Sequence, residues 1–203
     1  MKNHYDAILF DFDGVLADTE PVHYECWKEV LVPLGVQMDW PTFAEHCIGV
    51  PDRQAVEILC RLSRPPVDFE TAWATSARKQ EAFRRKTLEA PPIQPGTIDL
   101  LRSLDGVKLG VVTASARSEI EPILVRAGVS ELIDVLVCRD DVQRPKPAPD
   151  QYLEAARRLG ATKVLAVEDS EAGLASARAA GFETLRIDHP ANLTGRLRQC
   201  LGL

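Results

Sequence analysis

Two aspartates follow the first apolar run of the chain. Residues 7–10 (AILF) are typical of a buried strand, and Asp11 and Asp13 come directly after them, with Gly14 allowing a tight turn. Carboxylates this close repel each other, so a positive charge is expected beside them. The structural alternative is a turn in which both side chains accept hydrogen bonds from nearby amides. The pair therefore predicts either a cation site or a capped turn.

A hydroxyl and a lysine occupy similar places further along the chain. Thr113 ends the apolar run VVT, and its hydroxyl, with the following amides of Ala114 and Ser115, could hold a phosphate or a carboxylate. An ordinary helix N-cap is the alternative for Thr113 or Ser115. Lys146 lies between two prolines that restrict the backbone, which suggests a charge aimed at a fixed point. A solvated surface lysine is the usual alternative.

A second acidic pair follows the apolar run VLAV. Glu168 and Asp169 could simply favour the N-terminus of the next helix through its dipole. Together with Asp11 and Asp13, however, they would gather four carboxylates at one edge of a sheet. Such a cluster is unfavourable without a cation, and these oxygen ligands suit Mg²⁺.

Alternating strands and helices must position these residues. Continuous apolar strands separated by helices predict an α/β fold with a Rossmann-like parallel sheet covered on both faces. The expected strands are 6–11, 107–113, 133–138, 163–168 and 184–187, and the expected helices are 96–105, 117–127, 149–159 and 170–180.

The segment between the first strand and residue 91 has a different pattern. It shows helical periodicity over 21–34, 41–47, 52–62 and 68–89, interrupted by prolines. We therefore expect an α/β core domain of residues 1–17 and 92–203 and a helical domain of residues 18–91. Because ligands of open α/β sheets bind beyond the carboxyl ends of the strands, an insertion at this point is expected to act as a lid.

Composition excludes several classes of protein. The 203 residues carry a formal charge of −6, which argues against a nucleic-acid surface. Five scattered cysteines without a CxxC pair indicate reduced thiols. No signal peptide and no apolar run of about 20 residues is evident. We expect a cytoplasmic protein without membrane partners, as a monomer or small homo-oligomer.

The four motifs and the insertion closely resemble the haloacid dehalogenase superfamily, in its β-phosphoglucomutase-like and phosphoglycolate-phosphatase-like branch with a helical cap. The resemblance covers most of the chain. The acid at position 13 also distinguishes branches, because the dehalogenases of the superfamily lack an acid two residues after the nucleophile and need no Mg²⁺.

The resemblance implies a role for each motif residue. Asp11 would be the nucleophile that forms an aspartyl-phosphate. Asp13 would protonate the leaving oxygen and then activate water. Mg²⁺ would be held by Asp11, by the backbone carbonyl of Asp13 and by the acids Glu168 and Asp169. Nearby cations are expected to favour ionised Asp11. The remaining phosphoryl oxygens would be bound by Lys146 and Thr113 and, in the loop after Thr113, by Ala114 and Ser115.

The expected cap carries further candidate substrate contacts. Thr19 resembles the hinge threonine and His23 the cap-helix histidine of the β-phosphoglucomutase branch, and the loop around Gly49 resembles its specificity loop. That loop departs from the mutase pattern, which has a basic residue before the glycine and a Ser-Arg pair after Gly-Val; this chain has Ile48 and then Pro51-Asp52. Other candidate contacts for an anionic substrate are Arg53, Lys79 and Arg117, although each is more often a surface charge.

These observations favour a Mg²⁺-dependent phosphatase of a small phosphorylated metabolite, such as a sugar phosphate or a phosphoglycolate-like compound. A β-phosphoglucomutase-type mutase is the second interpretation. A third is a non-catalytic metabolite-binding protein that kept the fold.

Overall fold

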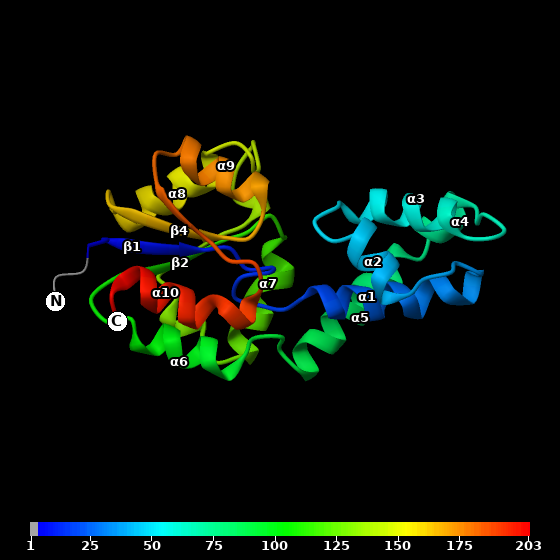
Figure 1. The fold of residues 1–203 in the computed structure, drawn as a ribbon, viewed down its shortest axis with the longest axis horizontal. Helices are drawn as coiled ribbons and strands as arrows, with labels where there is room; N and C mark the ends of the chain where they lie inside the picture. Colours follow the sequence, from blue (N-terminus) through cyan, green and yellow to red (C-terminus); the bar gives the residue numbers. More distant parts are fainter. Residues whose placement is uncertain (1–3) are drawn as a thin grey trace. The chain divides into compact units, whose positions relative to one another are not determined.

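The computed structural model describes residues 4–203. Its sheet has five parallel strands in the order β3-β2-β1-β4-β5 (Figure 1). The strands are β1 (Ala7–Phe10), β2 (Lys108–Val112), β3 (Val135–Val137), β4 (Val164–Glu168) and β5 (Glu183–Arg186). All five expected strands are confirmed, and the Rossmann-like α/β fold is as predicted.

The register of the central strands brings the predicted motifs to one edge. Phe10 in β1 is level with Val111 in β2 and with Val167 in β4. The residues that follow these positions therefore lie together at the carboxyl edge of three neighbouring strands. At this edge, the backbone N–H of Asp11 donates to the carbonyl of Val167 at 2.9 Å.

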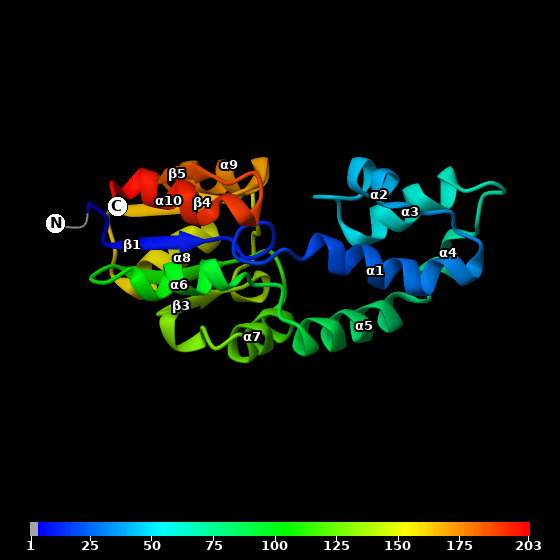
Figure 2. The same cartoon turned by 60° about the horizontal axis from the view of Figure 1, so that its bottom comes forward.

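Helices cover both faces of the sheet, as Figures 1 and 2 show: α8 and α9 lie on one face, and α6 and α10 on the other. The helices of this part of the chain are α6 (Pro95–Ser103), α7 (Arg117–Arg126), α8 (Asp150–Leu159), α9 (Glu171–Ala179) and α10 (Leu193–Leu201), with 3₁₀ turns at Ser130–Leu132, Arg139–Asp141 and Pro190–Asn192. The apolar strands are consequently buried on both sides.

The chain divides into two compact units. We call them the core unit, which joins the chain up to Asp18 to Pro91–Leu203, and the helical unit, Thr19–Ala90. The helical unit contains α1 (Glu20–Leu31), α2 (Trp40–His46), α3 (Asp52–Leu62), α4 (Phe69–Trp73) and α5 (Ser76–Glu89), with a 3₁₀ turn at Val32–Leu34. It has its own apolar core, which includes Trp27, Leu31, Phe43 and Leu59.

The expectation of one helix over 68–89 is wrong. The chain forms α4 and α5 with a break at Ala74 and Thr75. Both the backbone N–H and the side-chain hydroxyl of Thr75 donate to the carbonyl of Ala72, at 3.1 and 2.7 Å. These bonds close a tighter turn that competes with the helical hydrogen-bond pattern and ends α4. Among residues 4–203, none of the helices combines the length and the apolar character needed to cross a bilayer.

Candidate active site

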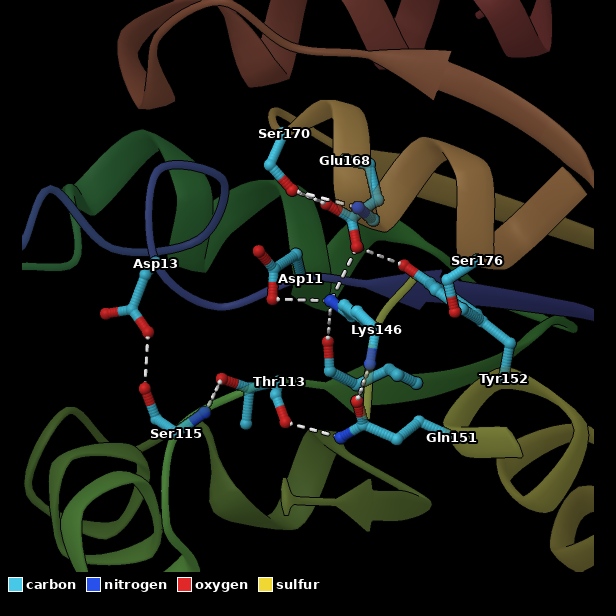
Figure 3. Close-up of polar contacts among 12 residues, drawn as sticks. Asp11, Asp13, Thr113, Ser115, Lys146, Gln151, Tyr152, Glu168, Ser170 and Ser176 are labelled. Atoms are coloured by element: carbon cyan, nitrogen blue, oxygen red, sulfur yellow. Dashed lines mark hydrogen bonds and ion pairs between the residues drawn. The ribbon is translucent and has the colours of Figure 1, made fainter. Parts of the chain in front are cut away.

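Lys146 lies at the centre of the acidic cluster at the edge of the sheet (Figure 3). Its Nζ atom donates to Asp11 Oδ1 at 3.0 Å, to Glu168 Oε1 at 2.5 Å and to the carbonyl of Val112 at 2.8 Å. Burial alone would lower the pKa of Lys146, but the carboxylates of Asp11 and Glu168 outweigh it and raise that pKa. The lysine therefore stays charged in the interior, aimed at the predicted nucleophile.

Lys146 alone does not offset the environment of Asp11. Burial, followed by the charge of Glu168, raises the pKa of Asp11 well above its ordinary value. The charge of Lys146 lowers the pKa of Asp11, as expected of a nearby cation, but burial and the charge of Glu168 outweigh it. That nearby cations together favour ionised Asp11 stays a prediction. Additional positive charge at this edge would favour the ionised form of Asp11.

Two glycines make room for the second acidic pair. A Cβ atom on Gly173 would come within about 2.2 Å of the carboxylate oxygens of Glu168, and one on Gly14 would lie 2.2 Å from Asp169 Oδ2. Glu168 is fully buried. Burial, and then the neighbouring Glu168, raises the pKa of Asp169 to about 6. The small residues thus permit a tight carboxylate cluster that is electrostatically costly by itself.

The cluster fits a divalent cation. Asp11, Glu168 and Asp169 each offer a carboxylate oxygen, and these three oxygens lie within 4.8 Å of one another. An all-oxygen donor set with excess negative charge suits Mg²⁺. This set does not include the side chain of Asp13, and a contribution of its backbone carbonyl stays a prediction.

Asp13 is instead held by the loop that follows β2. Ser115 donates its hydroxyl to Asp13 Oδ2 at 2.8 Å, and its backbone N–H donates to Thr113 Oγ1 at 3.0 Å. Thr113 is fully buried, whereas Ala114, between them, is exposed. The structure thus brings this loop to Asp13.

The helical unit contains a second buried charge. Sequence alone favours a surface position for Lys79, but the structure buries its side chain, and Nζ lies 2.8 Å from both Asp52 Oδ2 and His23 Nδ1. Burial alone would raise the pKa of Asp52, but Lys79 outweighs it and lowers that pKa. His23 stacks on Phe83 with ring centroids 4.3 Å apart. Two of the candidate cap residues therefore meet in one cluster.

The remaining candidates lie elsewhere. Arg53 is placed over the rings of Phe69 and Trp73, and Gly49 occupies an exposed turn with φ of 72°. Thr19 is buried and precedes α1. In the core unit, Arg117 donates to Asp141 Oδ2 at 2.8 Å and to the carbonyl of Leu136 at 2.9 Å. The structure therefore brings neither Arg53 into the Lys79 cluster nor Arg117 into the Lys146 cluster.

Sequence reasoning missed Gln151, Tyr152 and Asp52. Gln151 and Tyr152 contact the Lys146 cluster, and Asp52 pairs with Lys79. A signal was present for Gln151: the buried positions of α8 are Gln151, Tyr152, Ala155, Ala156 and Leu159. Helical periodicity places this polar amide on the apolar face, where it must find internal partners.

Known proteins are similar to this chain over most of its length. The model of the haloacid dehalogenase-like hydrolase family matches residues 8–187. The fructose-1-phosphate phosphatase YqaB of Escherichia coli (strain K12) is 32% identical over 190 residues, covering 92% of this chain and 98% of that protein. A β-phosphoglucomutase of Mycobacterium tuberculosis is 28% identical over 225 residues, covering 97% and 85%.

A solved structure is also similar over most of its length. The crystal structure of CbbY from Rhodobacter sphaeroides in complex with phosphate superposes with a TM-score of 0.68 at 29% identity, covering 89% of this chain and 84% of that one. With a family model that spans most of the chain and a relative that aligns over nearly its whole length, the protein belongs to the haloacid dehalogenase-like hydrolases.

Proposed function

We propose that the protein is a Mg²⁺-dependent phosphatase that hydrolyses a small phosphorylated carbohydrate through an aspartyl-phosphate on Asp11. The observation that carries this proposal is the arrangement of Lys146 beside Asp11, with Glu168 and Asp169 adjacent and Asp13 held by Ser115. A nucleophile, a phosphate-binding cation and a separate carboxyl group for proton transfer are the parts that phosphoryl transfer needs.

In the first step, the Asp11 carboxylate attacks phosphorus. A P–O bond to Asp11 forms, the P–O bond to the substrate alcohol breaks, and Asp13 gives its proton to the departing oxygen. In the second step, Asp13 takes a proton from water, which attacks phosphorus and releases inorganic phosphate and free Asp11. The charge of Lys146 lies beside Asp11, next to the transferring group, and the Thr113 loop holds the phosphoryl oxygens throughout.

Mg²⁺ would be held by Asp11, Glu168, Asp169 and the carbonyl of Asp13. When bound, it supplies charge neutralisation for Asp11 and for the transferring group. The raised pKa values of Asp11 and Asp169 support this assignment, because burial and the neighbouring Glu168 disfavour their ionised forms and a bound cation would favour them.

The helical unit favours a phosphatase over a mutase. A mutase must also bind a second phosphate, and α3, which follows Gly49, begins with Asp52 and Arg53. Asp52 is paired with Lys79, while Arg53 lies over Phe69 and Trp73. The two cations, Arg53 in α3 and Lys79 in α5, already have partners, so they are poorly placed to hold a second phosphate. We propose that His23, Lys79, Thr19 and Gly49 contribute to recognition of the alcohol part of the substrate.

A mutase activity remains the second candidate because a β-phosphoglucomutase is among the relatives. Inorganic phosphate release from a panel of sugar phosphates and phosphoglycolate, with Mg²⁺, separates the possibilities. Asp11→Asn is the control, and conversion of β-glucose 1-phosphate to glucose 6-phosphate is followed in parallel. Phosphate release that disappears in Asp11→Asn supports the phosphatase, whereas glucose 6-phosphate without free phosphate would replace it with the mutase.

The compartment is part of the proposal. All five cysteines are unpaired and four of them are buried. This pattern favours a reducing environment, and we propose a cytoplasmic location.

A further inference from the structure

The first turn of α8 carries two buried polar side chains that the motifs do not include. Gln151 and Tyr152 are adjacent in sequence, and both are completely excluded from solvent. A buried amide and a buried phenol are costly unless they are hydrogen-bonded. Their partners therefore show what this turn of the helix is built to hold.

Gln151 joins two loops of the proposed active site. Its Nε2 atom donates to the backbone carbonyl of Thr113 at 2.7 Å, and its Oε1 atom accepts the backbone N–H of Lys146 at 3.3 Å (Figure 3). Thr113 follows β2, whereas Lys146 lies in the proline-rich loop before α8. One side chain thus links the backbone of the two loops that carry Thr113 and Lys146.

Tyr152 holds Glu168 in place. Its hydroxyl donates to Glu168 Oε1 at 2.6 Å, and the same oxygen accepts from Lys146 Nζ at 2.5 Å. These two bonds use both lone pairs of Oε1, and the three bonds of Lys146 use all three ammonium protons. Rotation of either side chain would break a buried hydrogen bond.

The loop between Lys146 and α8 is itself anchored. Ser176 in α9 donates its hydroxyl to the carbonyl of Ala148 at 2.6 Å. The position of the α8 turn is therefore tied to the helix that follows Glu168 and Asp169.

We propose that Gln151 and Tyr152 are positioning residues for phosphoryl transfer, which set the relative positions of Thr113, Lys146 and Glu168. This inference rests on the proposed function. Donors fixed in advance stabilise the charge that develops on the transferring group without reorganising. Loosening them costs more in the transition state than in the ground state, so kcat falls more than KM rises.

The test compares three variants of the full chain. Tyr152→Phe removes only the hydroxyl, and Gln151→Met keeps the approximate volume without the amide. Leu153→Ala, at a half-exposed position of the same helix, is the matched control. For each, kcat and KM, the Tm, and inhibition by orthovanadate and by inorganic phosphate are measured with Mg²⁺. Orthovanadate adopts the five-coordinate geometry of the transferring group, whereas inorganic phosphate is a tetrahedral ground-state ligand.

We expect kcat to fall by about tenfold or more in Tyr152→Phe and in Gln151→Met, with KM changed by less than about twofold. Orthovanadate should lose about as much affinity as kcat loses, whereas phosphate affinity should change little. Leu153→Ala should match the wild type. Because Gln151→Met removes two buried hydrogen bonds and could unfold the chain, Tyr152→Phe decides the result in that case.

Two results would overturn this inference and leave the proposed function intact. The first is wild-type kcat in Tyr152→Phe and in a folded Gln151→Met, and the second is an equal loss of phosphate and orthovanadate affinity that follows the loss of Tm. Failure of the proposed function looks different, because the wild-type protein itself would then release no phosphate from any substrate in the panel.

Discussion

Lys146 Nζ and Glu168 Oε1 lie 2.5 Å apart, and the two side chains are only 5% and 0% exposed. Glu168 is therefore paired with a lysine from another loop and is not solvated. The pair connects the end of β4 to the loop before α8, so charge balance and loop position at the proposed active site depend on each other.

Replacing Lys146 tests this dependence. Lys146→Met leaves Asp11 and Glu168 buried without their cation, so we expect the free energy of unfolding to fall by about 3 kcal/mol or more at neutral pH. We expect kcat to fall by at least about 100-fold, because a fixed charge at the phosphoryl group is lost. Urea unfolding and phosphate release measure the two effects. The exposed Lys163→Met is the control. Wild-type kcat in Lys146→Met would contradict the assigned role.

Gly173 tests the packing of Glu168. Its Cβ in Gly173→Ala would collide with the Glu168 carboxylate, so we expect a loss of about 1–3 kcal/mol in the free energy of unfolding, together with reduced activity. Gly195→Ala is the matched control in α10, where nothing lies within 4 Å of the added atom. There the higher helix propensity of alanine should stabilise the protein by up to about 1 kcal/mol. Equal effects of the two substitutions would show that the close approach at Gly173 is unimportant.

The raised pKa of Asp169 leads to a prediction of how the effect of Mg²⁺ on stability depends on pH. Its pKa is raised from 3.8 to about 6, so in the metal-free protein the stability that Asp169 contributes is fully present below pH 3.8 and is lost as pH rises through about 6. Because Mg²⁺ binds the ionised carboxylate, we expect added Mg²⁺ to raise the Tm above about pH 6 and to have little effect near pH 3.8.

Thermal unfolding with Mg²⁺ and with a chelator, across this pH range, measures that difference. Asp169→Asn should reduce the gain in Tm and its pH dependence, whereas the exposed Asp140→Asn should leave both unchanged. A gain in Tm that is independent of pH in the wild type would show that Asp169 does not limit metal binding.

We expect the ion pair of Asp52 and Lys79 to contribute to the stability of the helical unit. Asp52→Asn leaves Lys79 buried without a carboxylate, and we expect a loss of about 1–2 kcal/mol, kept small because the Asp52 side chain is 44% exposed. Since the Asp52 pKa is lowered, the contribution of the pair is present above pH 3.8 and is lost as pH falls through the lower folded value. The mutational loss should therefore shrink in acid.

Tryptophan fluorescence during urea unfolding measures this effect selectively, because Trp27, Trp40 and Trp73 all belong to the helical unit. Glu70→Gln is the matched control: Glu70 lies 3.7 Å from Arg53, both side chains are exposed, and the expected change is below about 0.5 kcal/mol. An equally large effect of Glu70→Gln would indicate that burial of Lys79 is not the cause.

The strand-end residues could be predicted because each has a local signal. An apolar run followed by Asp11, Thr113 or Glu168 is visible in a few consecutive letters, and parallel strands end at a common edge. The break between α4 and α5 was missed because it depends on the hydroxyl of Thr75, a residue that helices tolerate.

Partners that meet only after folding could not be predicted in the same way. Lys79 and Asp52 are far apart in sequence, and no local pattern distinguishes a buried lysine from an exposed one. For Gln151, helical periodicity predicts burial, but the identity of its partners depends on how the end of β2 and the proline-rich loop are placed relative to each other.

The hydrogen bond from the Asp18 backbone N–H to the carbonyl of Pro92, 2.8 Å long, joins the two points where the core unit is interrupted. The two ends of the inserted helical unit are therefore adjacent at the point where it joins the core unit. The entropic cost of bringing the two ends of an insertion together grows only slowly with its length, so insertions of different sizes can be accepted here without disturbing the sheet. If the helical unit recognises the substrate as proposed, selection can change substrate preference by altering one continuous stretch of the gene, while the proposed phosphoryl-transfer residues evolve under separate constraints.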